Sequence, residues 1–240
     1  MAQSSRLQDL EKRFSDLETK LKPSPEKEAF SILHAIIHES RRQSSSSGRP
    51  ATNGDGVSLE EIQNLYKAAP PMEGAAENRG LAPGTTAPDF SLPDAGGQRL
   101  SLADFRGRNI VLVFYPLDWS PACSDQLSLY QSELEEFENL DTQLVGISVD
   151  SIYSHGAWAA VRGISFPLLS DFHPKGEVAR RYHVYRESDG FCERALYVID
   201  PGRVIRYAYV SPELHKVPNI YDLFERLRQL NRDAAQAPAI

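Results

Sequence analysis

Apolar residues follow two different rhythms along the chain, and the change falls near residue 80. Over residues 7–21 they recur at spacings of three and four, which predicts a short amphipathic helix that ends at the following prolines. A second periodic segment and a Ser/Gly-rich linker near 43–56 come next. We therefore expect residues 1–80 to form a helical N-terminal extension, which either packs on its own domain or makes a homodimer contact.

From residue 81 onward, short apolar runs alternate with amphipathic segments. Runs rich in β-branched or aromatic residues predict strands or strand-like segments at 98–105, 109–116, 143–150 and 166–171, and a hairpin at 194–210. Helical spacing of apolar residues predicts helices at 121–140, 151–163, 174–183 and 219–233. This alternation favours one α/β domain over residues 81–240, in which helices flank a mixed sheet.

Composition and charge narrow the class of protein. The 240 residues are 41% hydrophobic and 25% charged, as in ordinary globular proteins, and no apolar run reaches the roughly 18 residues that cross a bilayer. The net charge of -7, with basic residues interleaved among acidic ones, argues against nucleic-acid binding. The charged N-terminal residues lack the apolar core of a secretory signal, so we expect a cytoplasmic protein. In that compartment the two cysteines, Cys123 and Cys192, are expected to be free thiols.

Cys123 stands at the predicted start of a helix, directly after an apolar strand and a turn marked by prolines. Pro121 suits the first helical position and Ser120 suits the N-cap, which places Cys123 in the first turn. There the unpaired backbone N–H groups and the positive end of the helix dipole favour an anion, and the thiolate is the nucleophilic form of cysteine. The local sequence therefore predicts a reactive cysteine, which needs further hydrogen-bond donors beside its sulfur to be catalytic.

The stretch PLDWSPACSDQ, residues 116–126, resembles the peroxiredoxin active-site motif Pro-x-x-x-Thr/Ser-x-x-Cys. Four further blocks, APGTTAPDFSLPD, GISVDS, FPLLSD and RALYVID, are similar to segments that accompany this motif in the same order. The resemblance covers roughly residues 81–235 and does not reach residues 1–80. It implies a thioredoxin-like fold and a thiol peroxidase that reduces hydrogen peroxide or organic hydroperoxides without a metal or haem cofactor. It also implies a thiol reductant, either thioredoxin-like, glutaredoxin-like or of low molecular weight, and a homodimer or higher homo-oligomer.

The resemblance assigns a role to each matching residue. Cys123 would be the peroxidatic cysteine, which attacks the O–O bond and becomes a sulfenic acid. Ser120 would hydrogen-bond the peroxide, and Pro116 would shield the sulfur from water. Arg194 would stabilise the thiolate and the peroxide oxygens, and Gln126 would position that arginine.

Four of these residues also have simpler explanations. Cys123 could be only a small, buried apolar residue. Ser120 could act only as a helix cap, although a hydroxyl can both accept and donate. Pro116 could only end a strand, and Arg194 could be a surface ion-pair partner of Glu193.

Cys192 lies two residues before Arg194, so in an extended segment both side chains would point to the same face and towards Cys123. It could then resolve the sulfenic acid through an intramolecular disulfide, pair with another subunit, or be a packed thiol. The usual family positions for a resolving cysteine are not filled, since Ser128 stands five residues after Cys123 and no cysteine follows residue 192. We therefore expect a one-cysteine cycle that uses an external thiol.

Three alternatives to a peroxidase fit parts of the sequence. A peroxide sensor or holdase would share Cys123 and pass its oxidation to a partner protein through residues 1–80. A thioredoxin-like disulfide oxidoreductase needs Cys-x-x-Cys, and Ser120 occupies the first place. His34 and His38 have a spacing that can bind zinc, but no third ligand accompanies them and no metal site is expected.

Overall fold

The computed structural model of the chain describes residues 72–236. The expected N-terminal helices, the linker near 43–56 and the pair His34 and His38 lie outside the described residues. Contacts divide the chain into two units, Met1–Leu65 and Tyr66–Ile240, and the described residues belong to the second. Among residues 72–236, no helix combines the length and the apolar character that a membrane span requires.

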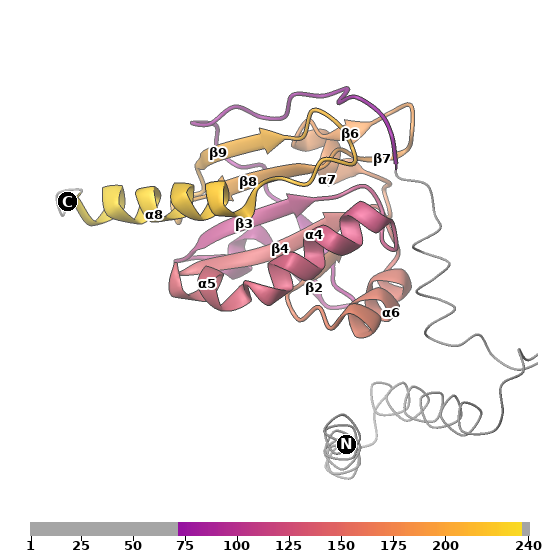
Figure 1. Ribbon diagram of the computed structural model, residues 1–240, viewed down its shortest axis with the longest axis horizontal. Coiled ribbons are helices and arrows are strands. Elements are labelled where there is room, and N and C mark those ends of the chain that lie inside the picture. Colours follow the sequence, from indigo (N-terminus) through magenta and orange to yellow (C-terminus); the bar gives the residue numbers. More distant parts are fainter. Residues whose placement is uncertain (1–71, 237–240) are drawn as a thin grey trace, which may run out of the picture. The chain divides into compact units, whose positions relative to one another are not determined.

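The second unit alternates strands and helices as the sequence predicts (Figure 1). In chain order its elements are β1 (Ser91–Pro93), β2 (Arg99–Ser101), the 3-10 helix η1 (Leu102–Phe105), β3 (Asn109–Phe114), α4 (Pro121–Ser132), α5 (Leu134–Asn139), β4 (Thr142–Ser148), α6 (Ile152–Arg162), β5 (Leu168–Ser170), α7 (Glu177–Arg181), β6 (Tyr185–Arg186), β7 (Phe191–Cys192), β8 (Ala195–Ile199), β9 (Ile205–Val210) and α8 (Ile220–Gln236). The five-stranded sheet has the order β5-β4-β3-β8-β9. Strands β3, β4 and β5 pair in parallel, whereas β8 pairs antiparallel to both β3 and β9, so the expected mixed sheet is confirmed.

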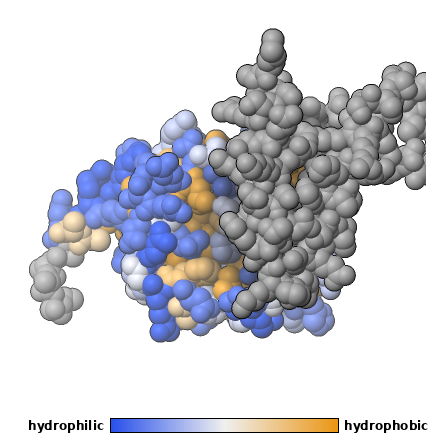
Figure 2. Space-filling view, turned by 90° about the horizontal axis from the view of Figure 1, so that it is seen from below, coloured by the Kyte–Doolittle hydropathy of each residue, from blue (hydrophilic) through white to orange (hydrophobic). Residues whose placement is uncertain are grey.

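The two faces of this sheet carry separate apolar clusters, because alternate side chains of a strand point to opposite faces. Val111 and Val113 of β3 pack in a cluster with residues of α4, α5, α6 and α8. Leu112 and Phe114 pack in a second cluster with residues of η1 and α7. Where Figure 2 shows described residues, much of the surface is hydrophilic, and apolar residues reach the surface there in a patch. Strand β3 is buried between the two clusters, and the loop after it leads to α4, where the candidate site lies.

Two predicted elements differ from the structure. The helix expected at 121–140 is broken at Glu133, where α4 ends and α5 begins. Ser132 Oγ donates to the Leu129 carbonyl at 2.8 Å, a local bond that competes with a continuous helical ladder. The segment expected to be extended over 98–105 is a strand only in its first part. The Asp104 carboxylate accepts hydrogen bonds from Ser101 N at 2.7 Å and Oγ at 2.6 Å, which starts a 3-10 turn instead.

Candidate active site

The thiol of Cys123 is buried in the first turn of α4. Ser120 is the N-cap residue, with an extended backbone (φ -65°, ψ 144°), and Pro121 follows at the start of the helix. Cys123, Leu127 and Tyr130 lie on the helix face that packs against the sheet, and none of them is exposed. The predicted helix start is therefore confirmed, and it holds the sulfur between the helix terminus and the core.

The guanidinium of Arg194 contacts this sulfur directly. Arg194 lies just before β8, is only 1% exposed, and places Nη2 3.4 Å from Cys123 Sγ. Its Nη1 donates to Gln126 Oε1, and its Nε donates to the Leu214 carbonyl at 2.8 Å. Three acceptors therefore fix the planar cation beside the sulfur.

Gln126 lies one helical turn after Cys123 and completes a short chain of buried polar groups. Its Oε1 accepts from Arg194, and its Nε2 donates to the Tyr130 hydroxyl at 3.2 Å. Burial raises the pKa of Tyr130 to about 12, so the phenol stays protonated over the physiological range. The Tyr130 phenol and the Gln126 amide are therefore both neutral. Among these residues, Arg194 alone brings a charge to the sulfur.

The hydroxyl of Ser120 is buried but has no hydrogen-bond partner among the described residues. Its side chain makes no cap bond, although its backbone carbonyl accepts the first helical bond from Ser124 N at 2.9 Å. A buried unpaired hydroxyl is unfavourable, and such groups mark positions where a ligand or water completes the hydrogen bonding. Pro116 is buried two residues after β3, in the loop that leads to Ser120.

The ion pair considered for Arg194 and Glu193 does not form. Glu193 is fully buried, and its carboxylate pairs with Arg186 at 3.1 Å. Arg194 is also buried and faces the sulfur instead. The interpretation of Arg194 as a surface ion-pair partner is therefore wrong.

A buried polar cluster, which the sequence analysis did not identify, holds the loop before α4. The Asp118 carboxylate accepts from the Tyr115 hydroxyl at 2.9 Å and from Ser154 Oγ at 2.7 Å. It also lies 2.9 Å from His155 Nδ1, and both side chains are buried. The next residue, Trp119, has a φ of 64°, and its Nε1 donates to Ser154 Oγ at 3.1 Å. The Asp118 cluster thus ties a left-handed, strained loop residue to the first turns of α6.

A second carboxylate extends this cluster to the end of β4. Asp150 Oδ2 accepts from Asp118 N at 2.9 Å and from Ser148 Oγ at 2.7 Å. Burial raises the pKa of Asp150, and the neighbouring Asp118 carboxylate raises it further. The loop before Cys123 is therefore anchored to two neighbouring elements through its own Asp118.

Cys192 is a second buried free thiol, at the end of β7. The chain bends at Arg194, between β7 and β8, so the segment is not extended as the same-face prediction requires. Cys192 packs in the cluster with Phe114, whereas Cys123 packs in the cluster on the other face of the sheet. Burial raises the pKa of the Cys192 thiol well above its ordinary value, and the nearby carboxylate of Asp171 adds to this effect.

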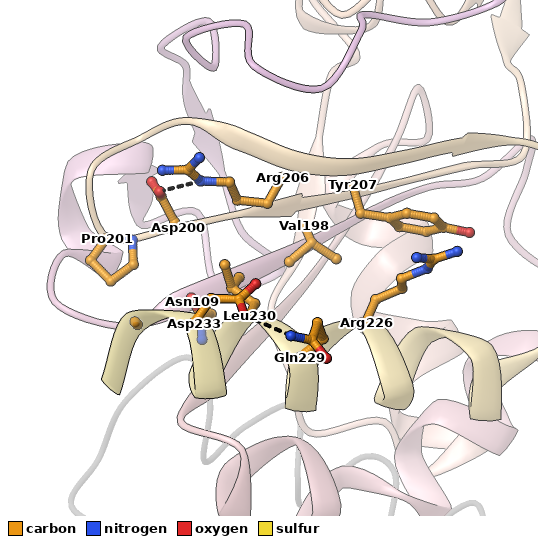
Figure 3. Close-up of a pocket in the computed structure, with 11 residues that line it drawn as sticks. Asn109, Val198, Asp200, Pro201, Arg206, Tyr207, Arg226, Gln229, Leu230 and Asp233 are labelled. Atoms are coloured by element: carbon orange, nitrogen blue, oxygen red, sulfur yellow. Dashed lines mark hydrogen bonds and ion pairs between the residues drawn. The ribbon is translucent and has the colours of Figure 1, made fainter. Parts of the chain in front are cut away.

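A cavity of about 440 Å³ lies away from these residues, between β8, β9 and α8 (Figure 3). Val198 and Leu230 line it together with charged side chains. In Figure 3, Arg206 pairs with Asp200 across one end. No residue expected at the site lines this cavity, and within residues 72–236 no group of three His, Cys, Asp or Glu side chains is placed to hold a metal ion.

Known proteins match the part of the chain that carries this geometry. The family model described as the AhpC/TSA family matches residues 83–208. Alkyl hydroperoxide reductase E of Mycobacterium tuberculosis is 42% identical over 126 residues, which are 52% of this chain and 82% of that protein. A putative peroxiredoxin of Synechocystis is 37% identical over 141 residues, 55% of this chain and 70% of its own length.

Solved structures agree with this match. The AhpC of Enterococcus faecalis superposes with a TM-score of 0.60 at 27% identity and covers 66% of this chain and 97% of its own. The peroxidoxin BcpB of Mycobacterium tuberculosis gives 0.57 at 28% identity, over 62% of this chain and 98% of its own. These likenesses favour a peroxidase over the sensor or holdase alternative. The chain belongs to the AhpC/TSA family of peroxiredoxins, and it is a thiol-dependent peroxidase that reduces peroxides at the expense of a thiol reductant.

Proposed function

We propose that Cys123 is the peroxidatic nucleophile and that Arg194 and Ser120 are its catalytic partners. The observation that carries this proposal is the 3.4 Å contact between Arg194 Nη2 and Cys123 Sγ. The unpartnered hydroxyl of Ser120 in the same buried turn supports it, since this hydroxyl is available to donate to a bound peroxide. Donors that are fixed before the reaction typically contribute about 10² to 10³ in rate each.

The proposed step is a displacement on oxygen. The thiolate of Cys123 attacks one peroxide oxygen, so that an S–O bond forms while the O–O bond breaks. The electron pair of the O–O bond leaves with the other oxygen, which takes up a proton and departs as water or an alcohol. Cys123 is thereby oxidised to a sulfenic acid, and the peroxide is reduced. Arg194 donates to the oxygens on which negative charge develops, and buried Pro116 keeps water from the sulfur.

We further propose a one-cysteine cycle. An external thiol attacks the sulfenic acid, which forms a mixed disulfide and releases water, and a second thiol then regenerates Cys123 as a disulfide of the reductant forms. Two observations support an external thiol. Cys192 packs in a different core cluster from Cys123, and its raised pKa keeps it protonated, whereas only a thiolate attacks efficiently. The reductant is proposed to be a thioredoxin-like or glutaredoxin-like protein or a low-molecular-weight thiol. The homo-oligomer and the cytoplasmic location stay predictions.

The test compares wild-type protein with Cys123→Ser and Cys192→Ser, using hydrogen peroxide and several thiol donors. We expect Cys123→Ser to lose all peroxide consumption and Cys192→Ser to keep it. Intact mass after one equivalent of peroxide should show a gain of one oxygen, or an adduct of the added thiol. Full consumption by Cys123→Ser would refute the proposal, and a loss of two hydrogens would refute the one-cysteine cycle.

A further inference from the structure

The chain segment before the family match runs along the back of the site. This N-terminal strap, residues 73–78, lies beside the segment that follows β9, where Ala76 N donates to the Pro212 carbonyl at 3.0 Å. Ala75 forms an antiparallel bridge with Glu213, and Leu214 N donates to the Gly74 carbonyl at 3.0 Å. The strap therefore fixes the backbone of residues 213 and 214 by the same bonds that join strands in a sheet.

The strap also supplies the hydrogen bonds of a buried carboxylate. Glu193 Oε1 accepts from the backbone N–H of Glu77 at 2.7 Å, from that of Asn78 at 3.0 Å, and from Asn78 Nδ2 at 3.3 Å. Its Oε2 accepts from Arg186 Nη1 at 3.1 Å, and Arg186 Nη1 also donates to the Ala75 carbonyl at 2.8 Å. Glu193 is fully buried, so the carboxylate is tolerated there only because these donors surround it.

Both groups that the strap holds, Glu193 and Leu214, are next to Arg194. Glu193 precedes it in the chain, so the four hydrogen bonds to that carboxylate fix the backbone from which the arginine side chain extends. Leu214, held by Gly74, provides the carbonyl that accepts from Arg194 Nε at 2.8 Å. The strap thus supports the arginine at its backbone, through Glu193, and at its guanidinium, through the Leu214 carbonyl.

We propose that Glu193 is a positioning residue for the peroxidase reaction, and that the N-terminal strap is the clamp through which it acts. The proposal rests on the role proposed above for Arg194. The guanidinium is planar, so a shift of its backbone or of the Leu214 carbonyl moves Nη2 relative to the sulfur. Misplacement of a catalytic group by about 1 Å can lower a rate roughly 10²-fold. The strap lies outside the family match of residues 83–208.

The experiment uses full-length Glu193→Ala, Glu193→Gln and Asn78→Ala, with Glu213→Gln as the matched control. The Glu213 side chain pairs with Lys216 at the surface, and its replacement leaves the backbone bridge to Ala75 intact. Three quantities are measured. The first is the single-turnover rate of Cys123 oxidation by hydrogen peroxide, the second is the pH midpoint of the thiolate absorbance of Cys123, and the third is the urea midpoint of unfolding.

We expect Glu193→Ala to oxidise about 10- to 100-fold more slowly and its thiolate transition to move to higher pH. Glu193→Gln should recover part of the rate, since its amide oxygen still accepts from the strap. Asn78→Ala should lose less, because the backbone N–H bonds to Glu193 remain; it also tests the clamp if Glu193→Ala does not fold. The control should match wild type in all three measurements.

A lower urea midpoint with wild-type oxidation rate and thiolate transition in Glu193→Ala and Asn78→Ala would show that the strap only stabilises the fold. Arg194→Met in the same assay separates the two proposals. If Arg194→Met reacts at the wild-type rate, the proposed role of Arg194 fails. If Arg194→Met is slow while Glu193→Ala and Asn78→Ala react at the wild-type rate, only the proposed clamp fails.

Discussion

Replacement of Asp118 by alanine tests whether the buried cluster before α4 holds the site together. The substitution removes the acceptor of the Tyr115 hydroxyl and of Ser154 Oγ, and it leaves His155 Nδ1 with only a long 3.4 Å contact to the Tyr115 hydroxyl. Asp118 is 5% exposed and His155 is not exposed, so water replaces these bonds poorly. Each buried polar group left unsatisfied costs about 1–3 kcal/mol. We therefore expect the free energy of unfolding to fall by about 3–5 kcal/mol, a large part of the roughly 5–15 kcal/mol that stabilises a typical domain.

Urea unfolding of Asp118→Ala, followed by fluorescence and circular dichroism, measures this change as a shift of midpoint at unchanged slope. Asp125→Ala is the control, because this carboxylate is exposed on α4 and its loss should change stability by less than about 0.5 kcal/mol. Peroxide oxidation of Cys123 should also slow, since the cluster holds Trp119 in its left-handed conformation. A loss of less than about 1 kcal/mol would refute the reasoning, because the cluster would then contribute no more than a single surface bond.

Three further changes test other parts of the molecule. Arg194→Lys should slow oxidation of Cys123 about 10²- to 10³-fold in stopped-flow measurements, because one ammonium cannot meet three acceptors in a plane, and a loss below threefold contradicts this. Cys192→Ala should leave peroxide turnover with an external thiol unchanged, as measured by peroxide consumption, whereas a tenfold loss would assign Cys192 a part in the cycle. Burial raises the pKa of Asp171 to about 6, so the folded state binds its proton more tightly than the unfolded state and loses stability as pH rises from about 4 towards 6 and beyond. Relative to Asp171→Asn, wild type should lose roughly 1 kcal/mol of unfolding free energy between pH 5 and pH 7.5, and equal pH profiles would contradict the raised pKa.

The start of α4 could be predicted from the sequence because its determinants are local. Proline at the first helical position and serine at the N-cap act within a few residues, and both occur where expected. The strands could be predicted from uninterrupted apolar runs such as 109–116, which is β3 with two further residues. The resemblance to peroxiredoxins then added Arg194 and Gln126, which the structure brings to the sulfur and to each other.

The remaining parts of the site depend on contacts between distant segments, which periodicity does not encode. Asp118 lies in the active-site motif and His155 in a helix predicted far along the chain, and only the fold brings their side chains within 2.9 Å. His183 has a φ of 56°, a left-handed backbone that is easiest for glycine and that the apolar pattern of the sequence does not reveal.

Arg194 is held by contacts from segments that lie far apart in the chain. Its contacts towards the chemistry, Cys123 and Gln126, lie inside the segment that matches the family. The Leu214 carbonyl that accepts from its Nε, and the N-terminal strap that binds Leu214 N, lie outside that segment on opposite sides in the sequence. Because the guanidinium is planar and rigid, it cannot follow a shift of one of its three acceptors without weakening its bonds to the other two. The family match therefore covers the groups that contact the sulfur, and the Leu214 carbonyl outside it supplies a further acceptor for the guanidinium.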